Sequence, residues 1–357
     1  MMVSFDSVPR TEGWFHESGS DYDVVLASRI RLSRNLAGHA FPHILKSEEE
    51  QEIQSDILSA VAGLGYTSAL IGELPPLERR MLLERHFISR DFSLQTHKAC
   101  LLRPDYCVSG MVNEIDHLRL SSFKGGRELV GCLEMADSVD SDLERTLDYA
   151  VSVEWGYLSP QVLNCGTGMR CSVMLHLPAL VETGLIDRAL KAIVQVGMTV
   201  KGFFSDDDSS LGHMYQVSNQ STFGFTESDL IEKLDVIAHQ LVHYERKARG
   251  ELFENSRAEV EDRVLRALGI LRFCRKISVR EVIDHLSSIR LGVALGIVEA
   301  PLTRITALLF LTQKAHVQVT VRDHEDSSDE DLVDEQRARI IRDALIREEV
   351  NWEDLHV

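Results

Sequence analysis

The sequence predicts an α+β protein with a mixed first domain and a helical second domain. Short apolar runs typical of strands recur up to about residue 250, with helical patterns among them, whereas the later residues are nearly all helical in pattern. We therefore place a boundary near Gly250, with domains at 1–250 and 251–357. A chain of 357 residues is long enough for one large domain and one smaller domain.

Charge and cysteine content narrow the class of protein. The formal net charge of −18 argues against nonspecific binding to nucleic acid or anionic membranes, because both need an excess of Lys and Arg. The six cysteines show no paired CxxC spacing, which is typical of reduced thiols in the cytoplasm. The N-terminal residues do not resemble a signal peptide, and no run approaches the roughly 20 apolar residues of a membrane span. We expect a cytoplasmic protein.

Helical and strand patterns alternate over the first 160 residues. The apolar run VVLA at 24–27 predicts a strand, and the spacing of apolar residues from Ser47 to Leu64 predicts a helix. A second helix is expected at LERRMLLERH, residues 77–86. Further strands are expected at ACLLR (99–103), YCVSGMV (106–112), LVGCLEM (129–135) and VSVEWGYL (151–158).

Two helical stretches and an acidic segment follow. LPALVETGLIDRALKAIVQVG at 177–197 has a helical pattern, and 228–249 has one continuous apolar face. Thr226 with Asp229 resembles a capping box for the second stretch, and Gly250 suits its C-terminal end. The acidic residues at 323–336 are expected to form a mobile surface segment.

The motif SRIR, Ser28 to Arg31, follows the first expected strand. If the strand continues, Arg29 and Arg31 project from the same face, two residues apart. Two guanidinium groups aimed at one spot match phosphate oxygens, since each can bind them bidentately. Exposed surface arginines are the commoner explanation for so short a motif.

A glycine-rich motif lies in NCGTGMRCSVMLHLPAL, residues 164–180. Gly166 and Gly168 flank Thr167 ahead of Arg170, and the run then becomes apolar, as in a helix. Backbone N–H groups and an arginine at such a junction can bind an anion. A plain glycine turn before a core helix explains the pattern equally well.

Two further segments mix charged and apolar residues. MVNEIDHLRL at 111–120 is expected in a strand, where Ile115 either points into the core or occupies a place at which chemistry needs a carboxylate. The DHLR within it, which ends at Arg119, could equally be a solvated strand edge. VKGFFSDD at 200–207 places Lys201 before a loop with three consecutive acids, and a solvated acidic loop is the usual meaning of that pattern.

Taken in order and at their separations, SRIR, NE-DHLR, GTGxRxSVMLHLPAL, VKGxx-D, VSNQ and ERKAR resemble the ATP:guanidino phosphotransferases. The match is nearer to the bacterial protein-arginine kinases than to the creatine and arginine kinases. It continues through EDRVLRALGIL, SSIRLGVALGI and LFLTQKAHVQ, and so covers nearly the whole chain. The resemblance implies a glutamine-synthetase-like antiparallel β-sheet flanked by helices, with ATP and Mg²⁺ lying across the sheet, and a C-terminal helical domain.

The resemblance also implies which residues meet the nucleotide. Phosphate groups are assigned to Arg29, Arg31, Arg119 and Arg170, in keeping with a reaction that is mostly positioning and charge neutralisation. The complete set assigned to the nucleotide is Ser28, Arg29, Arg31, His86, Arg119, Arg170, Cys171, Ser172, Val173, Met174, Lys201, Gly202 and Asp206.

The acceptor side departs from the family pattern. The resemblance assigns catalysis to carboxylates at Glu114 and Asp206, but Ile115 stands where the family has the glutamate that orients the guanidinium and acts as general base. Gln161 replaces a cysteine that contacts the substrate, and Lys201 replaces an arginine. Two accounts remain open: slow phosphorylation of arginine, or a pseudokinase that binds nucleotide and a protein partner without transfer.

Regulation and partners are implied by the resemblance alone. The protein-arginine kinases carry an Arg-Asp-x-x-Arg-Ala pocket for phosphoarginine, which Asp334, Arg337 and Ala338 fit, although Val333 replaces the first arginine. A surface helix with incidental charges is the competing interpretation. The implied partners are ATP and arginine-containing proteins, with an activator protein and a homodimer as open possibilities.

Overall fold

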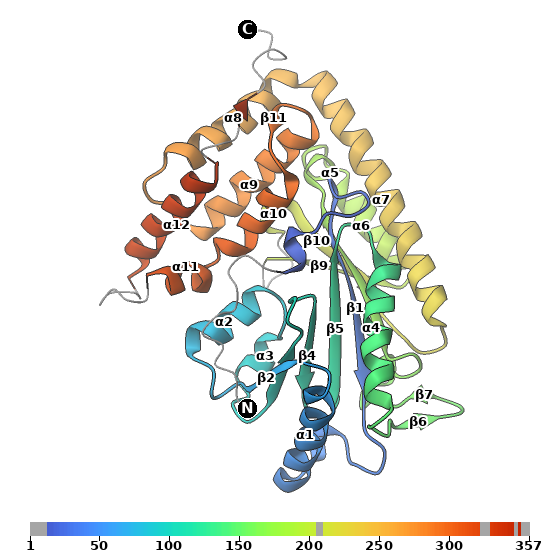
Figure 1. The fold of residues 1–357 in the computed structure, drawn as a ribbon. Helices are drawn as coiled ribbons and strands as arrows, with labels where there is room; N and C mark the ends of the chain where they lie inside the picture. The colour runs from blue at the N-terminus through green and yellow to red at the C-terminus, as the bar shows by residue number, and fades with distance from the viewer. Residues whose placement is uncertain (1–12, 205–209, 322–328, 346–348, 351–357) are drawn as a thin grey trace.

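The fold is built on one eight-stranded antiparallel sheet (Figure 1). The computed structural model describes residues 13–204, 210–321, 329–345 and 349–350. The strands of this sheet are β1 Val25–Arg34, β2 Thr67–Leu70, β3 Ala99–Leu102, β4 Val108–Val112, β5 Leu118–Gly125, β8 Met169–His176, β9 Met198–Gly202 and β10 Met214–Asn219. Their order is β2-β3-β4-β5-β1-β8-β10-β9, and every neighbouring pair is antiparallel. The predicted α+β class and antiparallel sheet are confirmed.

Helices surround the sheet, and most of the remaining chain is helical. Up to residue 255 they are α1 Ser47–Ala62, α2 Pro76–Glu84, α3 Arg90–Ser93, α4 Leu129–Glu144, α5 Pro178–Glu182, α6 Ile186–Gln195 and α7 Glu227–Asn255. The later helices are α8 Arg257–Phe273, α9 Val279–Ala294, α10 Leu302–Leu311, α11 Lys314–Thr320 and α12 Glu330–Leu345. The short 3₁₀ turns are η1 Trp14–His16, η2 Pro42–Ile44, η3 Val162–Asn164 and η4 Leu211–His213. Two small two-stranded sheets pair β6 Val151–Ser152 with β7 Gly156–Tyr157, and β11 Val298–Glu299 with β12 Glu349–Val350.

The two faces of the sheet differ in chemistry, because successive side chains of a strand alternate between them. On β1, Ile30 and Leu32 point to one face and belong to a core cluster with residues of α4 and α7. Arg29 and Arg31 point to the other face. Helices α4 and α7 therefore cover the apolar face, and the arginines lie on the face towards α2 and the C-terminal helices (Figure 1).

Several expected elements differ from those observed. The segment 129–135, expected as a strand, begins α4, whose Leu129, Cys132 and Ala136 are buried at helical spacing. The apolar run after Arg170 is strand β8 rather than a helix, because it lies at the centre of the sheet with both faces covered. The segment 111–120 is divided by a turn at residues 113–117 between β4 and β5.

Helix α7 begins as expected and ends later. Thr226 caps it, with its Oγ1 accepting from the Asp229 N–H and the Asp229 carboxylate accepting from the Thr226 N–H. The helix continues through Gly250 to Asn255, so Gly250 does not end it. The boundary between two domains stays a prediction. One hydrophobic cluster joins sheet residues such as Phe123 to Phe310 of α10.

The acidic stretch 323–336 is partly outside the described residues, which resume at 329. From Glu330 it is the first part of α12, and Val333 there is buried. Among the described helices, none is long and apolar enough to cross a membrane.

Candidate active site

Four arginines gather on one face of the three central strands. In the antiparallel register Arg31 of β1 lies opposite Arg170 of β8, and Ser33 of β1 lies opposite Arg119 of β5. Directly opposite residues share a face, and alternation adds Arg29 to the same face. The four predicted phosphate ligands are thus brought together by strand pairing, although they are up to 141 residues apart in the sequence, from Arg29 to Arg170. We call this set the arginine cradle.

Hydroxyl groups hold two members of the arginine cradle, Arg29 and Arg170. Arg29 Nε donates to Ser172 Oγ at 3.3 Å, and Arg170 Nη2 donates to Thr199 Oγ1 at 3.0 Å and to Ser218 Oγ at 3.1 Å. Among the described residues, the buried Nε atoms of Arg31 and Arg119 have no hydrogen-bond partner. Hydroxyls orient a guanidinium without neutralising it, so Arg29 and Arg170 keep their positive charge, and the cradle keeps donors for an anion.

Burial and the repulsion between neighbouring arginines both lower the pKa values of three of the cradle arginines. Burial, and then the charges of Arg170 and Arg119, lower the pKa of Arg29 to about 10. Burial and the neighbouring arginines also lower the pKa of Arg31 and of Arg170. Because arginine side chains stay protonated in proteins, these guanidinium groups repel one another, and a polyanion placed among them would relieve the repulsion.

A cavity of about 850 Å³ opens over two members of the arginine cradle. Arg29 and Arg31 form part of its floor, while α2, the residues after β9 and Gln313 form its walls. The volume is in the range of pockets that hold small ligands. Lys201 and Gly202 of β9, which the resemblance assigns to the nucleotide, line this cavity, and Asp206 lies outside the described residues.

His86 lies in the wall of the same cavity in a left-handed backbone conformation, with φ of 61°. Its ring centroid is 4.3 Å from that of Phe203. Burial, followed by the charges of Arg29 and Arg31, lowers the pKa of His86 to about 3. The ring is therefore neutral at physiological pH and offers a flat surface beside Phe203.

The remaining predicted nucleotide residues divide between the two faces. Ser172 and Met174 share the face of Arg170, whereas the side chains of Cys171 and Val173 are in the core cluster under α7. Ser28 also points away from the cradle, because its Oγ donates to Gly126 O at 2.9 Å. None of these five side chains lines the cavity, and neither do those of Arg119 and Arg170. The strand alternation at β8 could have predicted this division, had the segment been recognised as a strand.

Sequence reasoning missed a second group of arginines on the cavity wall. Arg79 and Arg80 of α2 line the cavity together with Ser89 and Arg90 at the start of α3. The adjacent Arg-Arg pair in a predicted helix was the available signal. The position of this arginine pair over the sheet depends on the packing of α2 against the C-terminal helices. One contact of that packing is a hydrogen bond in which Glu84, at the end of α2, accepts from the Ala315 N–H at 2.8 Å.

Glu114 lies in the turn between β4 and β5 and is bound to the cradle. It forms an ion pair with Arg119, and its Oε1 accepts from Ser89 Oγ at 2.8 Å. Burial opposes ionisation, but the charge and hydrogen bond of Arg119 outweigh it, so the pKa of Glu114 is lowered. A carboxylate with a lowered pKa is a weak proton acceptor.

Ile115 is half-buried in the same turn and belongs to neither core cluster. Its neighbour Asp116 is buried, and Asp116 Oδ1 accepts from Asn35 Nδ2 at 2.9 Å and from Ser159 Oγ at 2.6 Å. Ser159 begins the loop that carries Gln161, which is exposed, while Cys165 of that loop is buried. The turn of Ile115 and the loop of Gln161 are therefore tied together.

The residues predicted for regulation face inwards. Arg337 of α12 is buried, and its guanidinium donates to Thr312 O and to Ile277 O, both at 2.8 Å, and pairs with Asp334. Ala338 is also buried. Arg337 is thus neither an incidental surface charge nor a side chain open to solvent, and its contacts serve the packing of α12.

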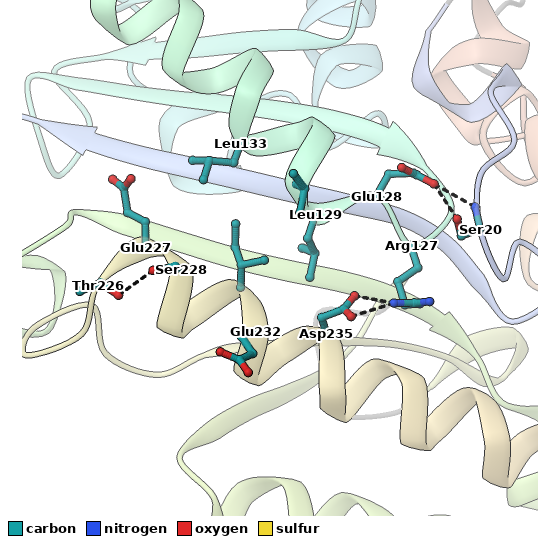
Figure 2. A pocket seen from close by; sticks show the side chains of 12 residues that line it. Ser20, Arg127, Glu128, Leu129, Leu133, Thr226, Glu227, Ser228, Glu232 and Asp235 are labelled. Carbon is teal, nitrogen blue, oxygen red and sulfur yellow. Dashed lines mark hydrogen bonds and ion pairs between the residues drawn. The ribbon is translucent and has the colours of Figure 1, made fainter.

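A second cavity of about 870 Å³ lies between the first turns of α4 and α7, away from the cradle (Figure 2). Its rim is acidic, with Glu128, Glu227 and Glu232 around an apolar floor. Arg127 Nη1 donates to both carboxylate oxygens of Asp235, at 2.7 and 2.8 Å. This excess of negative charge does not suit a phosphate ligand, so the cavity over the arginine cradle is the candidate active site.

Comparisons with known proteins identify the family of the chain. Residues 50–248 match the model of the ATP:guanido phosphotransferase C-terminal catalytic domain, and residues 257–354 match that of the protein-arginine kinase McsB C-terminal domain. The chain is 40% identical over 347 residues to the protein-arginine kinase of Desulforamulus reducens, covering 95% of each chain. It is 38% identical over 312 residues to that of Bacillus subtilis, covering 85% of this chain and 86% of the relative.

Solved structures show the same fold. The duplicated taurocyamine kinase of Schistosoma mansoni superposes with a TM-score of 0.55 at 21% identity, over 69% of this chain and 36% of that one. A lombricine kinase superposes with a TM-score of 0.54 at 19% identity, over 65% of this chain and 68% of that one. With two family models that together span most of the chain and relatives at 40% identity, the chain belongs to the ATP:guanido phosphotransferase family.

Proposed function

We propose that the protein binds Mg-ATP over the arginine cradle and transfers the γ-phosphoryl group to the guanidinium of an arginine in a protein, at a reduced rate. The observation that supports this most is the cradle itself, in which hydroxyls hold Arg29 and Arg170 and no carboxylate among the described residues pairs with either of them. Two buried guanidinium N–H groups have no partner among the described residues and would be satisfied by phosphate oxygens.

Each group of residues in the site would have a separate role in phosphoryl transfer. Arg119 and Arg170 would neutralise and align the phosphates, each with charge-assisted hydrogen bonds worth roughly 1.5–3 kcal/mol. Lys201 would add one charge without a second donor fork. Mg²⁺ that enters with the nucleotide would further neutralise the negative charge that develops on the phosphates. His86 and Phe203 offer an uncharged surface on which a base could stack.

The residues expected beside the substrate arginine support a slow phosphoryl transfer. A protonated arginine must lose a proton as its nitrogen attacks phosphorus, and Ile115 cannot accept it. Glu114 and Asp116 are the adjacent carboxylates, but Asp116 binds Asn35 and Ser159. Arg119 and Ser89 occupy the oxygens of Glu114, and the pKa of Glu114 is lowered. We propose Glu114, with Asp206, as the remaining catalytic carboxylates. General-base catalysis typically contributes about 10²–10⁴-fold, and this sets the size of the expected loss.

A second candidate function follows from the same two positions. With Ile115 and Gln161 on the acceptor side, the protein would bind nucleotide and a protein partner without transfer, as a pseudokinase. An activator protein and a second copy of the chain, which the resemblance leaves open, also belong to the proposal.

The described cysteines are free and mostly buried, in keeping with a site of action in the cytoplasm.

Mass spectrometry of phosphoarginine tests the proposal. The protein is incubated with Mg-ATP and an arginine-rich protein, and the products are kept under conditions that preserve the acid-labile P–N bond. We expect slow, ATP-dependent phosphoarginine that Arg170→Ala abolishes and Arg266→Ala leaves intact. Arg266 is a suitable control, since it is exposed on α8 and pairs with Asp262 of the same helix. Nucleotide binding without phosphoarginine would favour the pseudokinase instead.

A further inference from the structure

An exposed apolar surface borders the acceptor side of the active site, and we call it the apolar platform. It is formed by the β6–β7 hairpin, which projects beside the first turns of α7 in Figure 1, by η3, and by the loop before α7. Its exposed members are Val151, Val153, Trp155, Val162, Leu163, Phe223 and Phe225. So many large apolar side chains in one place mark an interaction site, because single scattered ones are the norm.

Hydrogen bonds join the three segments of the apolar platform into one unit. Tyr157 N donates to Gly166 O at 2.8 Å, and Thr222 N donates to Leu163 O at 2.9 Å. The rings of Trp155 and Phe223 stack across two segments, with centroids 5.2 Å apart and planes inclined by 22°. The apolar side chains are therefore displayed on a fixed support and remain exposed, with Val153 fully open to solvent.

The apolar platform is linked to the turn at residues 113–117 that contains Ile115, which we call the acceptor turn. Gln161 directly precedes η3, so one loop carries both Gln161 and the exposed Val162. That loop is fastened to the turn of Ile115 by the bond from Ser159 Oγ to Asp116 Oδ1, at 2.6 Å. Asn35 Nδ2 reinforces the link, since it donates both to Asp116 and to Leu158 O at 2.9 Å. A ligand at the acceptor turn would thus lie beside the platform.

We propose that the apolar platform binds apolar side chains of the substrate polypeptide close to the acceptor arginine. The preferred substrates are extended segments in which an arginine is flanked by aliphatic or aromatic residues. The identity of the acceptor as a protein arginine rests on the proposed function, whereas the apolar contact follows from the exposed surface. A second copy of the chain seated here would cover the acceptor turn and compete with protein substrates. The net charge of −18 argues against an anionic lipid surface as the occupant.

The test compares two fluorescent peptides that each contain one arginine, flanked in one by Leu, Val and Phe and in the other by Ser and Gly. Fluorescence anisotropy measures their binding to the full chain with Mg-ADP present. We expect the apolar peptide to bind about tenfold tighter, the effect of burying one or two apolar side chains. Val153→Ser with Trp155→Ala should remove this preference without lowering the melting temperature.

Phe273→Ala is the matched control, because Phe273 is an exposed aromatic residue on α8, outside the apolar platform. It should keep the preference for the apolar peptide. Equal binding of both peptides to the wild type would overturn the proposal. So would a dimer in sedimentation that dissociates in the double variant, because the platform would then be an interface between copies.

Phosphoarginine measured on the same two peptides separates this proposal from the proposed function. Selective binding of the apolar peptide without any transfer would refute the kinase activity and leave the apolar platform supported. Transfer to both peptides with the same KM would support the kinase activity and refute the platform.

Discussion

Ile115 is the residue on which the proposed slow transfer depends most. It lies next to a glutamate that is bound by an arginine of the cradle, and next to an aspartate that holds the loop of Gln161. It is half-buried and outside both core clusters, so packing alone does not explain an isoleucine there. The turn retains its polar scaffold around one apolar side chain.

Restoring the acceptor side should raise the rate of transfer. We expect Ile115→Glu together with Gln161→Cys to increase phosphoarginine formation by about 10²-fold or more, the usual contribution of a general base. Mg-ADP affinity should hardly change, because neither residue lies in the arginine cradle. Ile115→Gln with Gln161→Cys is the control, since it has the shape of the first variant without the base. A gain in the control as large as that with glutamate would contradict a base at this position.

His117 should make the fold sensitive to acid. Its Nδ1 accepts from the Leu36 N–H at 2.9 Å and its Nε2 lies 2.8 Å from Ala40 O, which suits the neutral ring. Burial lowers its pKa from 6.5 to about 4. Because the unfolded chain binds the proton more readily, stability falls as pH drops from 6.5 towards 4, by about 2 kcal/mol at pH 5.

Denaturant titrations at pH 7 and pH 5 measure this loss. His117→Asn keeps an acceptor for the Leu36 N–H and does not titrate, so its stability should fall less over that interval. Equal losses in the variant and the wild type would assign the acid sensitivity to other groups.

At the scale of single residues, the sequence predicted the arginine cradle but not its surroundings. Arg29 and Arg31 could be placed on one face from their spacing, yet their position beside Arg119 and Arg170 depends on strand order. Arg79 and Arg80 reach the cavity only through the packing of α2. Spacing determines local direction, whereas contacts between distant segments depend on the tertiary fold.

At the scale of elements, helix α12 depends on Arg337. Three acceptors, two of them backbone carbonyls, surround its guanidinium. We expect Arg337→Lys to lower the free energy of unfolding by about 3 kcal/mol, because one ammonium group cannot replace the planar fork in a buried site. Arg339→Lys on the same helix is the control, since Arg339 is exposed and should change stability by less than about 0.5 kcal/mol.

Urea denaturation of both variants measures the difference. If Arg337→Lys is as stable as the wild type but responds differently to phosphoarginine, the side chain is a ligand-binding group rather than a structural one.

Strands β3 and β4 were predictable from the sequence, whereas β8 and α4 were not. The run after Arg170 is apolar at nearly every position because β8 is covered on both faces, and periodicity cannot distinguish such a strand from a buried helix. The start of α4 is rich in apolar residues within one short window, which resembles a strand until the spacing of Cys132, Ala136 and Val139 is considered. Local pattern was ambiguous in both cases, and burial decided the outcome.

At the scale of the whole molecule, the sheet and the C-terminal helices share a core. Trp14 stacks on Phe123 of β5 with ring centroids 5.8 Å apart, and contacts Phe310 of α10 with centroids 5.0 Å apart. His176 of β8 and Ser287 of α9 are hydrogen-bonded at 2.8 Å in the same interior. A substitution in the C-terminal helices can therefore alter the packing of the cavity wall.

This shared core predicts cooperative unfolding. Urea denaturation followed by circular dichroism and by tryptophan fluorescence should give one coincident transition. A first transition that removes only part of the helical signal, with fluorescence unchanged, would show that the residues after α7 unfold independently.

Calorimetric titration of Mg-ADP tests the arginine cradle most directly. We expect the wild type to bind at submillimolar concentration, and Arg170→Ala to weaken binding by about tenfold or more, because it removes a charge-assisted contact of roughly 1.5–3 kcal/mol. The melting temperature without ligand should be retained, and Arg266→Ala should bind like the wild type. No heat of binding with the wild type at millimolar Mg-ADP, or equal affinity in Arg170→Ala, would contradict nucleotide binding at this site.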